Sequence, residues 1–228
     1  MYNELLFFGE ILASFLLVML AYKLFGKIGL FVWAGMAVIL ANIQVFKTIQ
    51  IFGLVTAMGN VIYSSIFLVT DIFNEVHTKK DAQQSVWIGF FVLLAVTALM
   101  QISLLFIPDA SDLLSPHLTA IFSLLPRIAF ASLAAYLISQ SFDVWLYSIL
   151  KKKEGKARLW LRNNVSTMIS QLIDNSVFTL IAFVGVMDWN IILEIFITSY
   201  ILKFLIAAAD TPFIYWARSL KKTGTLIK

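Results

Sequence analysis

The sequence predicts an all-α, polytopic transmembrane helix bundle. Of its 228 residues, 61% are hydrophobic and only 13% are charged, whereas a soluble domain is about 45–50% apolar and about 25% charged. A soluble core of this size cannot bury so much apolar surface, so lipid is its natural solvent. At about 20 residues per spanning helix, seven spans and their loops use almost the whole chain. We therefore expect one integral membrane domain over residues 1–228.

Seven apolar runs are long enough to cross a bilayer. In chain order they are Leu5–Tyr22, Ile28–Val45, Phe52–Ile72, Ser85–Ile107, Arg127–Leu150, Val165–Val184 and Ile191–Trp216. The runs are apolar on all sides, unlike alternating barrel strands, and backbone in hydrocarbon must form its hydrogen bonds within the segment. We therefore expect helices and no strands. The first run follows a leader without Lys or Arg, so we expect a mature helix instead of a signal peptide.

The distribution of charge predicts the orientation of the bundle. Fourteen of the 17 Lys and Arg residues lie in the first, third and fifth loops and in the C-terminal tail, which seven spans place on one side. The other side holds only Lys47, and Arg127 and Lys203 lie at or within helices. Because positive loops stay inside, we expect a multi-pass protein of the cytoplasmic (inner) membrane, N-terminus outside and C-terminus inside. These loops account for the net charge of +4, so we expect no nucleic-acid partner.

Polar side chains follow one face of several predicted spans. A charge in hydrocarbon costs about 2.5–3.5 kcal/mol, so such residues need a partner, a water-filled cavity or a function. We expect these faces to line the bundle interior. The residues are Asn60, Ser64, Asp71 and Asn74, with the aromatic Phe67 on the same face and Glu75 one step beyond it, in the third span; Ser132, Tyr136, Gln140 and Asp143 in the fifth; Thr167, Ser170, Gln171, Asp174 and Asn175 in the sixth; and Ser199, Lys203 and Asp210 in the seventh.

Asp174 and Lys203 fall near the middle of the membrane, where a pair between neighbouring helices would neutralise both. The pair either fixes helix register alone or lines a midplane cavity, where transporters bind substrate. The group from Asp71 to Glu75 is equally compatible with a solvated helix end. Arg127, directly after Pro126, is either a site residue or an anchor at headgroup level.

The chain lacks the usual motifs of membrane enzymes. It contains no G-x-x-x-x-G-K, no H-E-x-x-H, no G-x-S-x-G and no cysteine. These absences argue against an ATPase, a zinc protease, a serine hydrolase and a thiolate metal site. We expect a carrier or a substrate-binding membrane subunit, with no catalytic residues, no cofactor and no metal.

Four segments carry a more specific pattern. They are Val69–Val76 with Lys79 and Lys80; Arg127–Ala129 with Ser132, Tyr136, Gln140 and Asp143; Ser166–Thr167 with Asp174 and Ile181–Phe183; and Glu194 with Tyr200 and Lys203. In this order, over about residues 30–217, they resemble the queuosine precursor transporters, which are vitamin-uptake-transporter-like integral membrane proteins. One departure is Gln171, where the family usually has Asn.

The resemblance implies a six-helix transport core, residues 28–217, and one extra N-terminal transmembrane helix, residues 1–27. It also implies import of a small-molecule substrate, a 7-deazaguanine such as preQ0, preQ1 or queuine. The side chains expected to bind this substrate are Asn60, Phe67, Asp71, Asn74, Glu75, Arg127, Tyr136, Gln140, Asp143, Gln171, Asp174 and Lys203.

The chemistry of these residues suits a deazaguanine. A carboxylate such as Asp174 can accept from the ring N–H and the exocyclic amine, and an amide such as Gln140 can donate to the carbonyl. An aromatic ring such as Tyr136 can stack on the bicycle.

Two other hypotheses stay open. The chain could be the substrate-capture subunit of an ATP-driven, energy-coupling-factor type vitamin transporter, which agrees with the missing ATPase motif. An intramembrane enzyme is the distant alternative. The sequence leaves the energy source and the oligomeric state undetermined, and it is compatible with a homo-oligomer and with a separate energising module.

Overall fold

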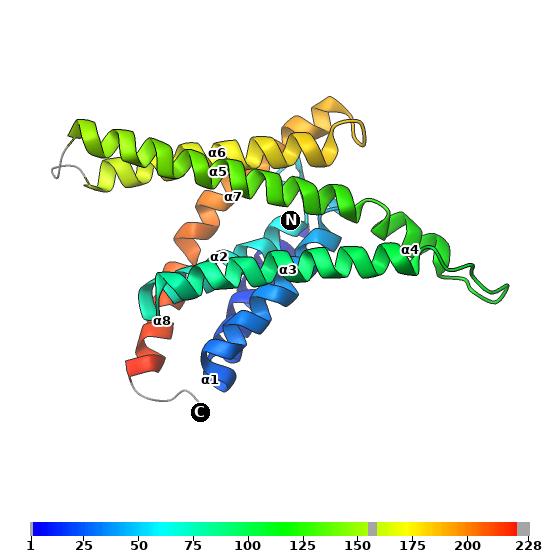
Figure 1. Ribbon diagram of the computed structural model, residues 1–228, viewed down its shortest axis with the longest axis horizontal. Coiled ribbons are helices and arrows are strands. Elements are labelled where there is room, and N and C mark those ends of the chain that lie inside the picture. Colours follow the sequence, from blue (N-terminus) through cyan, green and yellow to red (C-terminus); the bar gives the residue numbers. More distant parts are fainter. Residues whose placement is uncertain (1, 155–158, 223–228) are drawn as a thin grey trace.

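The protein is mainly helical, as the sequence predicts (Figure 1). The computed structural model describes residues 2–154 and 159–222, without a few side chains, among them Asp143 and the basic residues of the fifth predicted loop. Within these residues the elements are α1 Tyr2–Gln44, β1 Thr48–Ile51, β2 Leu54–Ala57, α2 Gly59–Val76, α3 Lys79–Ser103, α4 Ser115–Phe122, α5 Leu125–Glu154, α6 Leu159–Phe183, α7 Trp189–Ala209 and α8 Thr211–Lys222.

Three helical segments of the described residues are long and apolar enough to cross a membrane: Tyr2–Gln44, Lys79–Ser103 and Ser115–Phe142. Large apolar side chains on these segments point outward, and Phe91 and Phe130 are 73% and 64% exposed. Water-soluble monomers rarely expose contiguous apolar surface of this extent. Lipid solvates it, and the protein is therefore embedded in a membrane.

Helix α1 contains the first two predicted spans, which turn back on each other at Gly26. Gly26 has φ 57°, a conformation that favours a residue without a β-carbon. The first half of α1 lies within the main apolar cluster, where Phe7, Phe15 and Val18 are almost fully buried. Phe15 meets Phe213 of α8 edge to face, with ring centroids 5.2 Å apart. The segment predicted as an extra helix thus packs at the centre of the fold.

A short β-hairpin corrects the expectation of helices alone. Strands β1 and β2 pair antiparallel, with Ile51 opposite Leu54. Phe52 and Gly53 form the turn and both have positive φ, as the tight two-residue hairpin turn requires. The strands are rich in β-branched residues, which favour extended backbone. The third predicted span, Phe52–Ile72, is therefore wrong at its start, because α2 begins only at Gly59.

The predicted last span, Ile191–Trp216, is also corrected, because it divides into α7 and α8. Asp210 lies between the two helices, and Pro212 lies in the first turn of α8. Proline lacks an N–H and clashes with the preceding turn, so it is tolerated at a helix start but not within a helix. The chain therefore changes direction where the sequence suggested a continuous helix.

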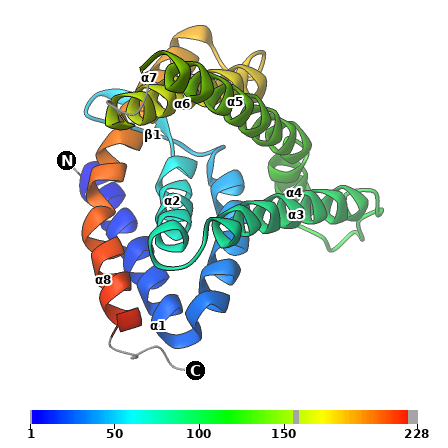
Figure 2. The same ribbon diagram turned by 60° about the vertical axis from the view of Figure 1, so that its left-hand side comes forward.

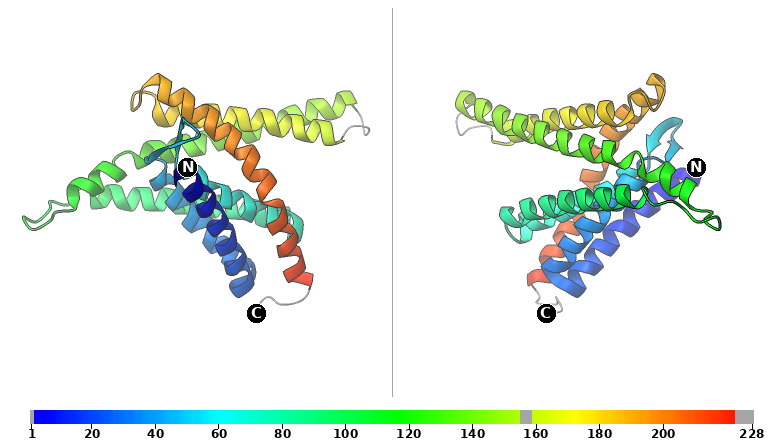
Figure 3. Two further views of the ribbon diagram at one scale, coloured as in Figure 1. Left: turned by 180° about the vertical axis from the view of Figure 1, so that it is seen from behind. Right: turned by 45° about the vertical axis from the view of Figure 1, so that its right-hand side comes forward.

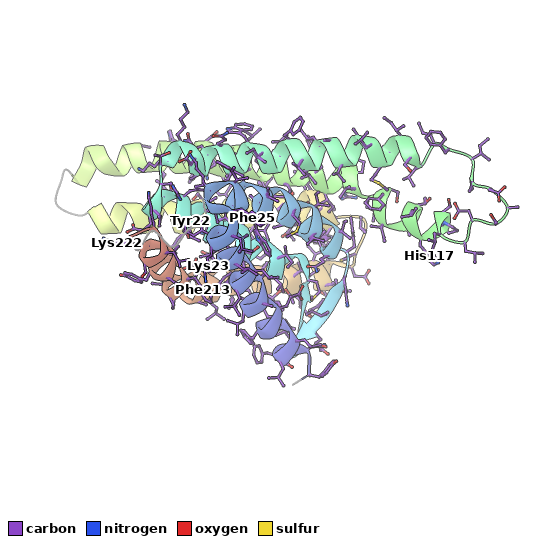
Figure 4. The ribbon with its side chains drawn as sticks, turned by 90° about the horizontal axis from the view of Figure 1, so that it is seen from below. Tyr22, Lys23, Phe25, His117, Phe213 and Lys222 are labelled. Carbon is purple, nitrogen blue, oxygen red and sulfur yellow. The ribbon has the colours of Figure 1, made fainter. Side chains whose placement is uncertain are left out.

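One end of the bundle joins the Gly26 turn, the turn between α2 and α3, and α8. Lys27 forms an ion pair with Asp81, and Arg218 on α8 lies 3.3 Å from Glu75. The described part of this end carries positively charged loop residues. Figure 4 shows Lys222 toward this side of the molecule and His117, on α4, at the far side.

The opposite end joins the N-terminus, the hairpin and the loop between α6 and α7. The backbone N–H of Phe52 donates to Glu4 of α1. At the same end Arg127, at the start of α5, donates to the carbonyl of Val184.

Two groups of helices meet at α7 and at direct contacts of α5 with α1 and α3. Helix α2 packs against α1, α3 and α8 (Figure 2). Helices α5 and α6 run side by side as an antiparallel pair that diverges from this group toward the α5–α6 loop (Figure 3). Helix α7 contacts both α2 and α6, so it bridges the two groups. A site at this junction draws residues from α1, α2, α5, α6 and α7.

Candidate functional site

A polar cavity of about 60 Å³ lies at this junction. Ala57 at the end of β2 and Gly59 at the start of α2 lie at its edge. A volume of this size holds a few ordered waters, and it is much smaller than the pockets of about 300–1,000 Å³ that hold drug-sized ligands. The polar lining residues are Asn42, Asn60, Tyr63, Ser132, Asp174, Asn175, Thr179, Ser199 and Lys203.

The predicted ion pair between the sixth and seventh predicted spans is present in this cavity. Lys203 Nζ on α7 lies 3.0 Å from Asp174 Oδ2 on α6, and the two side chains are 13% and 25% exposed. Ser139 on α5 donates to the other carboxylate oxygen at 3.4 Å. The pair is neutral as a unit, which makes two charges tolerable in the bundle interior. The ammonium has three N–H groups, so two stay free for a ligand.

Asn60 connects α2 with α7 beside the pair. Its side-chain nitrogen donates to Ser199 Oγ at 2.7 Å and to Thr56 Oγ1 at 3.4 Å. Thr56 belongs to β2, so the hairpin joins the same network.

The hairpin is held against α7 by two hydrogen bonds to its backbone. The N–H of Val55 donates to Glu194 Oε2 at 2.7 Å, and Thr198 Oγ1 donates to the carbonyl of Val55 at 3.0 Å. Because Ala57 of the same strand lines the cavity, the hairpin closes the end of the cavity that faces the N-terminus.

Arg127 lies away from the cavity lining. Its guanidinium donates to the carbonyl of Ile181 at 2.6 Å and to that of Val184, at the end of α6. The last carbonyls of a helix lack partners within the helix, and a cation there also interacts favourably with the helix dipole. Arg127 thus caps α6 and fixes it to the start of α5.

The inner part of the polar face of α2 also lies outside the cavity lining. The carboxyl group of Asp71 lies within hydrogen-bonding reach of that of Asp210. Glu75 pairs with Arg218 at 3.3 Å, and Asn74 is exposed.

The remaining predicted residues whose side chains the structure describes do not line the cavity. Phe67 contacts the cavity residue Tyr63 edge to face at 5.3 Å between ring centroids. Tyr136 packs against Phe90 of α3 at 5.0 Å. Gln140 is exposed and Gln171 is half-buried. The side chain of Asp143 lies outside the described residues. The structure therefore brings Asn60, Asp174 and Lys203 together.

Several lining residues were not among those predicted to bind substrate. Asn175 and Ser199 lie on the polar faces that the sequence shows, beside Asp174 and one turn before Lys203. Tyr63 lies one turn after Asn60, which is a signal that spacing could have found. Asn42 is isolated in an apolar run, and its sequence context contains no such signal.

His77, in the turn between α2 and α3, lies outside the spans and is electrostatically perturbed. Burial lowers the pKa of His77 from 6.5, and the positive charges of Lys221 and Lys27 lower it further, against the opposing effect of Asp81. The hydroxyl of Tyr22 is hydrogen-bonded to His77 Nε2 at 3.0 Å. Neutral His77 therefore suits the folded protein best.

A membrane-embedded helical bundle with a charged, polar cavity at the junction of its helices is the arrangement that transporters use. The chain belongs to the vitamin uptake transporter family, whose family model matches residues 57–217. A protein of Bacillus subtilis (strain 168) named "Probable queuosine precursor transporter" is 43% identical over 221 residues, 96% of each chain. This similarity includes most of the N-terminal helix. No solved structure matches the chain.

Proposed function

We propose that the protein imports a queuosine precursor, a 7-deazaguanine such as preQ0, preQ1 or queuine, across the cytoplasmic membrane through this cavity. The observation that carries the proposal is the Lys203–Asp174 pair, which lies among neutral hydrogen-bonding side chains at the junction of the helices. The name of the similar protein from Bacillus subtilis supports the choice of substrate.

The lining groups complement a deazaguanine. The free N–H groups of Lys203 can donate to the ring carbonyl, and the side-chain oxygens of the lining can accept from the ring N–H and the exocyclic amine. Tyr63, which lines the cavity, offers an aromatic face for stacking. The predicted residues outside the lining, from Phe67 to Glu75 on α2 and from Tyr136 to Gln140 on α5, would line the path on which substrate leaves the cavity.

We also propose that the two halves of α1, with α2, α3, α5, α6 and the α7–α8 segment, form seven membrane crossings. The Lys27–Asp81 pair and the Arg218–Glu75 pair support this topology, because they gather the turns predicted to be positive at one end. That end would face the cytoplasm, since positive loops stay inside. The hairpin would then close the cavity from the outside, and substrate entry would require it to separate from α7.

Uptake of labelled precursor by cells that lack their own importer tests the proposal. Expression of this chain should restore uptake, and Asp174→Ala should abolish it at equal membrane expression. Asp188→Ala, which makes the same change at an exposed position outside the cavity lining, is the matched control and should retain most activity. Normal uptake by the Asp174→Ala variant would show that the cavity is not the binding site.

A further inference from the structure

Asn175 on α6 is buried beside the ion pair and lines the cavity. The residue is 3% exposed, and its neighbour in the chain is Asp174. Its side-chain nitrogen donates to the backbone carbonyl of Phe196 on α7 at 2.8 Å. This bond settles which end of the amide faces α7, because a backbone carbonyl can only accept. The amide nitrogen must face Phe196, and the oxygen must point the other way.

The oxygen of Asn175 is left as a free acceptor that is open to the cavity. Among the described residues, the fully enclosed side-chain atoms without a hydrogen-bond partner include one each of Gln44 and Thr97, and Asn175 Oδ1 is not one of these enclosed atoms. Asn175 Oδ1 also has no partner in the described part of the chain, so it must be accessible, and the space next to it is the cavity. A buried acceptor in such a position costs free energy until a donor reaches it.

The other two asparagines of the lining do not present a fixed free acceptor. Asn60 bonds to the hydroxyl of Ser199, which can donate or accept, so this amide can turn over to suit its neighbours. Asn42 is engaged at both ends, because its nitrogen donates to the Val38 carbonyl and its oxygen accepts from Ser132 at 3.4 Å.

The Asp174 carboxylate is less available than the Asn175 amide oxygen to accept hydrogen bonds from a ligand. Both of its oxygens have partners, Lys203 at 3.0 Å and Ser139 at 3.4 Å. A ligand that took either oxygen would compete with a bond that neutralises the charge. Asn175 Oδ1 can accept from a ligand without breaking the ion pair.

We propose that Asn175 is a specificity-determining residue whose Oδ1 accepts a hydrogen bond from one N–H donor of the substrate, the ring N1–H or the exocyclic amine. The inference rests on the proposed import of a 7-deazaguanine. It assigns the discrimination between donor and non-donor ligands to a neutral amide, and it leaves charge compensation to Lys203 and Asp174. An analogue without the donor leaves Asn175 Oδ1 unpaired, whereas the parent satisfies it.

Binding of three compounds to the purified full chain in lipid nanodiscs tests the inference by calorimetry. The probes are 7-deazaguanine, 7-deazahypoxanthine, which lacks the exocyclic amine, and 1-methyl-7-deazaguanine, which lacks the ring N1–H. Wild type should prefer the parent over at least one analogue by about tenfold or more. Asn175→Ala should reduce that ratio to about one, since no acceptor is left to lose its partner. Asn190→Ala, which makes the same change at an exposed position of α7 outside the cavity lining, is the matched control and should keep the ratio.

Each result decides between the hypotheses. A wild-type preference that persists unchanged in Asn175→Ala overturns the specificity role of Asn175. If Asn175→Ala does not fold, Asn175→Thr is used instead, because it retains bulk and a hydroxyl but not the amide oxygen Oδ1. The ratio of affinities for 7-deazaguanine and its analogues then tests the inference in the same way. If the wild-type chain binds none of the three compounds, the proposed function itself is overturned, and the inference about Asn175 is overturned with it.

Discussion

Removal of one member of the Lys203–Asp174 pair is expected to destabilise the protein more than removal of both. Asp174→Asn leaves the Lys203 ammonium, which is 13% exposed, without its counter-charge in the bundle interior. Lys203→Met leaves the carboxylate in the same state. The double variant Asp174→Leu with Lys203→Met fills the space with apolar groups of similar volume and leaves no charge behind.

The geometry of the pair sets the size of the effect. Two unit charges 3.0 Å apart attract each other by about 5 kcal/mol at an effective dielectric constant of about 20. Partial exposure reduces this value, so each single substitution should lower the free energy of unfolding by about 2–4 kcal/mol. The double substitution should change it by no more than about 1 kcal/mol, because desolvation no longer opposes folding.

Two measurements on the same variants separate the structural role of the pair from its transport role. Chemical denaturation in detergent micelles should show the non-additive pattern, with the double variant close to wild type. Uptake by the double variant should nevertheless be lost. Additive losses of stability would refute the coupling, and normal uptake by a stable double variant would show that the pair only fixes helix register.

Three further predictions follow from other parts of the fold. The chain has no cysteine, so the double variant Val55→Cys, Thr198→Cys should form a single disulfide between the hairpin and α7 and stop uptake until reductant is added. Uptake by fully cross-linked protein would contradict an outer gate, and so would loss of uptake in either single variant. Gly59→Ala places a β-carbon 2.5 Å from a carbonyl oxygen of α1 and should lower the free energy of unfolding by about 1–3 kcal/mol. Gly9→Ala, which has open space around it, should have little effect in the same denaturation assay. Burial and two nearby lysines lower the pKa of His77 from 6.5, so the imidazole binds its proton more readily in the unfolded chain than in the folded protein. Thermal stability should therefore decline as pH falls from 6.5 through the folded-state pKa of His77. An unchanged pH profile in His77→Gln would contradict this account.

The helical positions and the central ion pair could be predicted from sequence because they depend on local rules. Long apolar runs specify helices in lipid, and two opposite charges buried at similar depth must meet or be neutralised. Lys203 and Asp174 satisfy this requirement at 3.0 Å. The polar spacing on the sixth and seventh predicted spans also included Asn175 and Ser199.

The hairpin and the helix break could not be predicted from apolarity alone. A short apolar run does not distinguish a strand from a helix, and the hairpin depends on distant partners such as Glu194 and Glu4. The break at Asp210 follows from Pro212, a local signal that the hydropathy of Ile191–Trp216 concealed.

The assignment of residues to the cavity depended on how the helices are tilted. Polar faces with the same residue spacing on different helices do not all reach the cavity, because α5 and α6 diverge from α2 and α3 (Figure 1). Asn60 near the start of α2 therefore lines the cavity, whereas Glu75 near the end of the same helix pairs with Arg218 of α8. Arg127 caps α6, a role that requires knowledge of where the end of α6 lies.

Uptake of labelled 7-deazaguanine by proteoliposomes that contain only this purified chain tests the central claim most directly. We predict accumulation of the label that excess unlabelled compound suppresses and that the Asp174→Leu, Lys203→Met double variant abolishes. Absence of uptake by correctly folded wild-type protein would contradict transport by the lone chain and would favour a capture subunit that needs a separate energising module. Equal uptake by the double variant would show that the cavity is not the route.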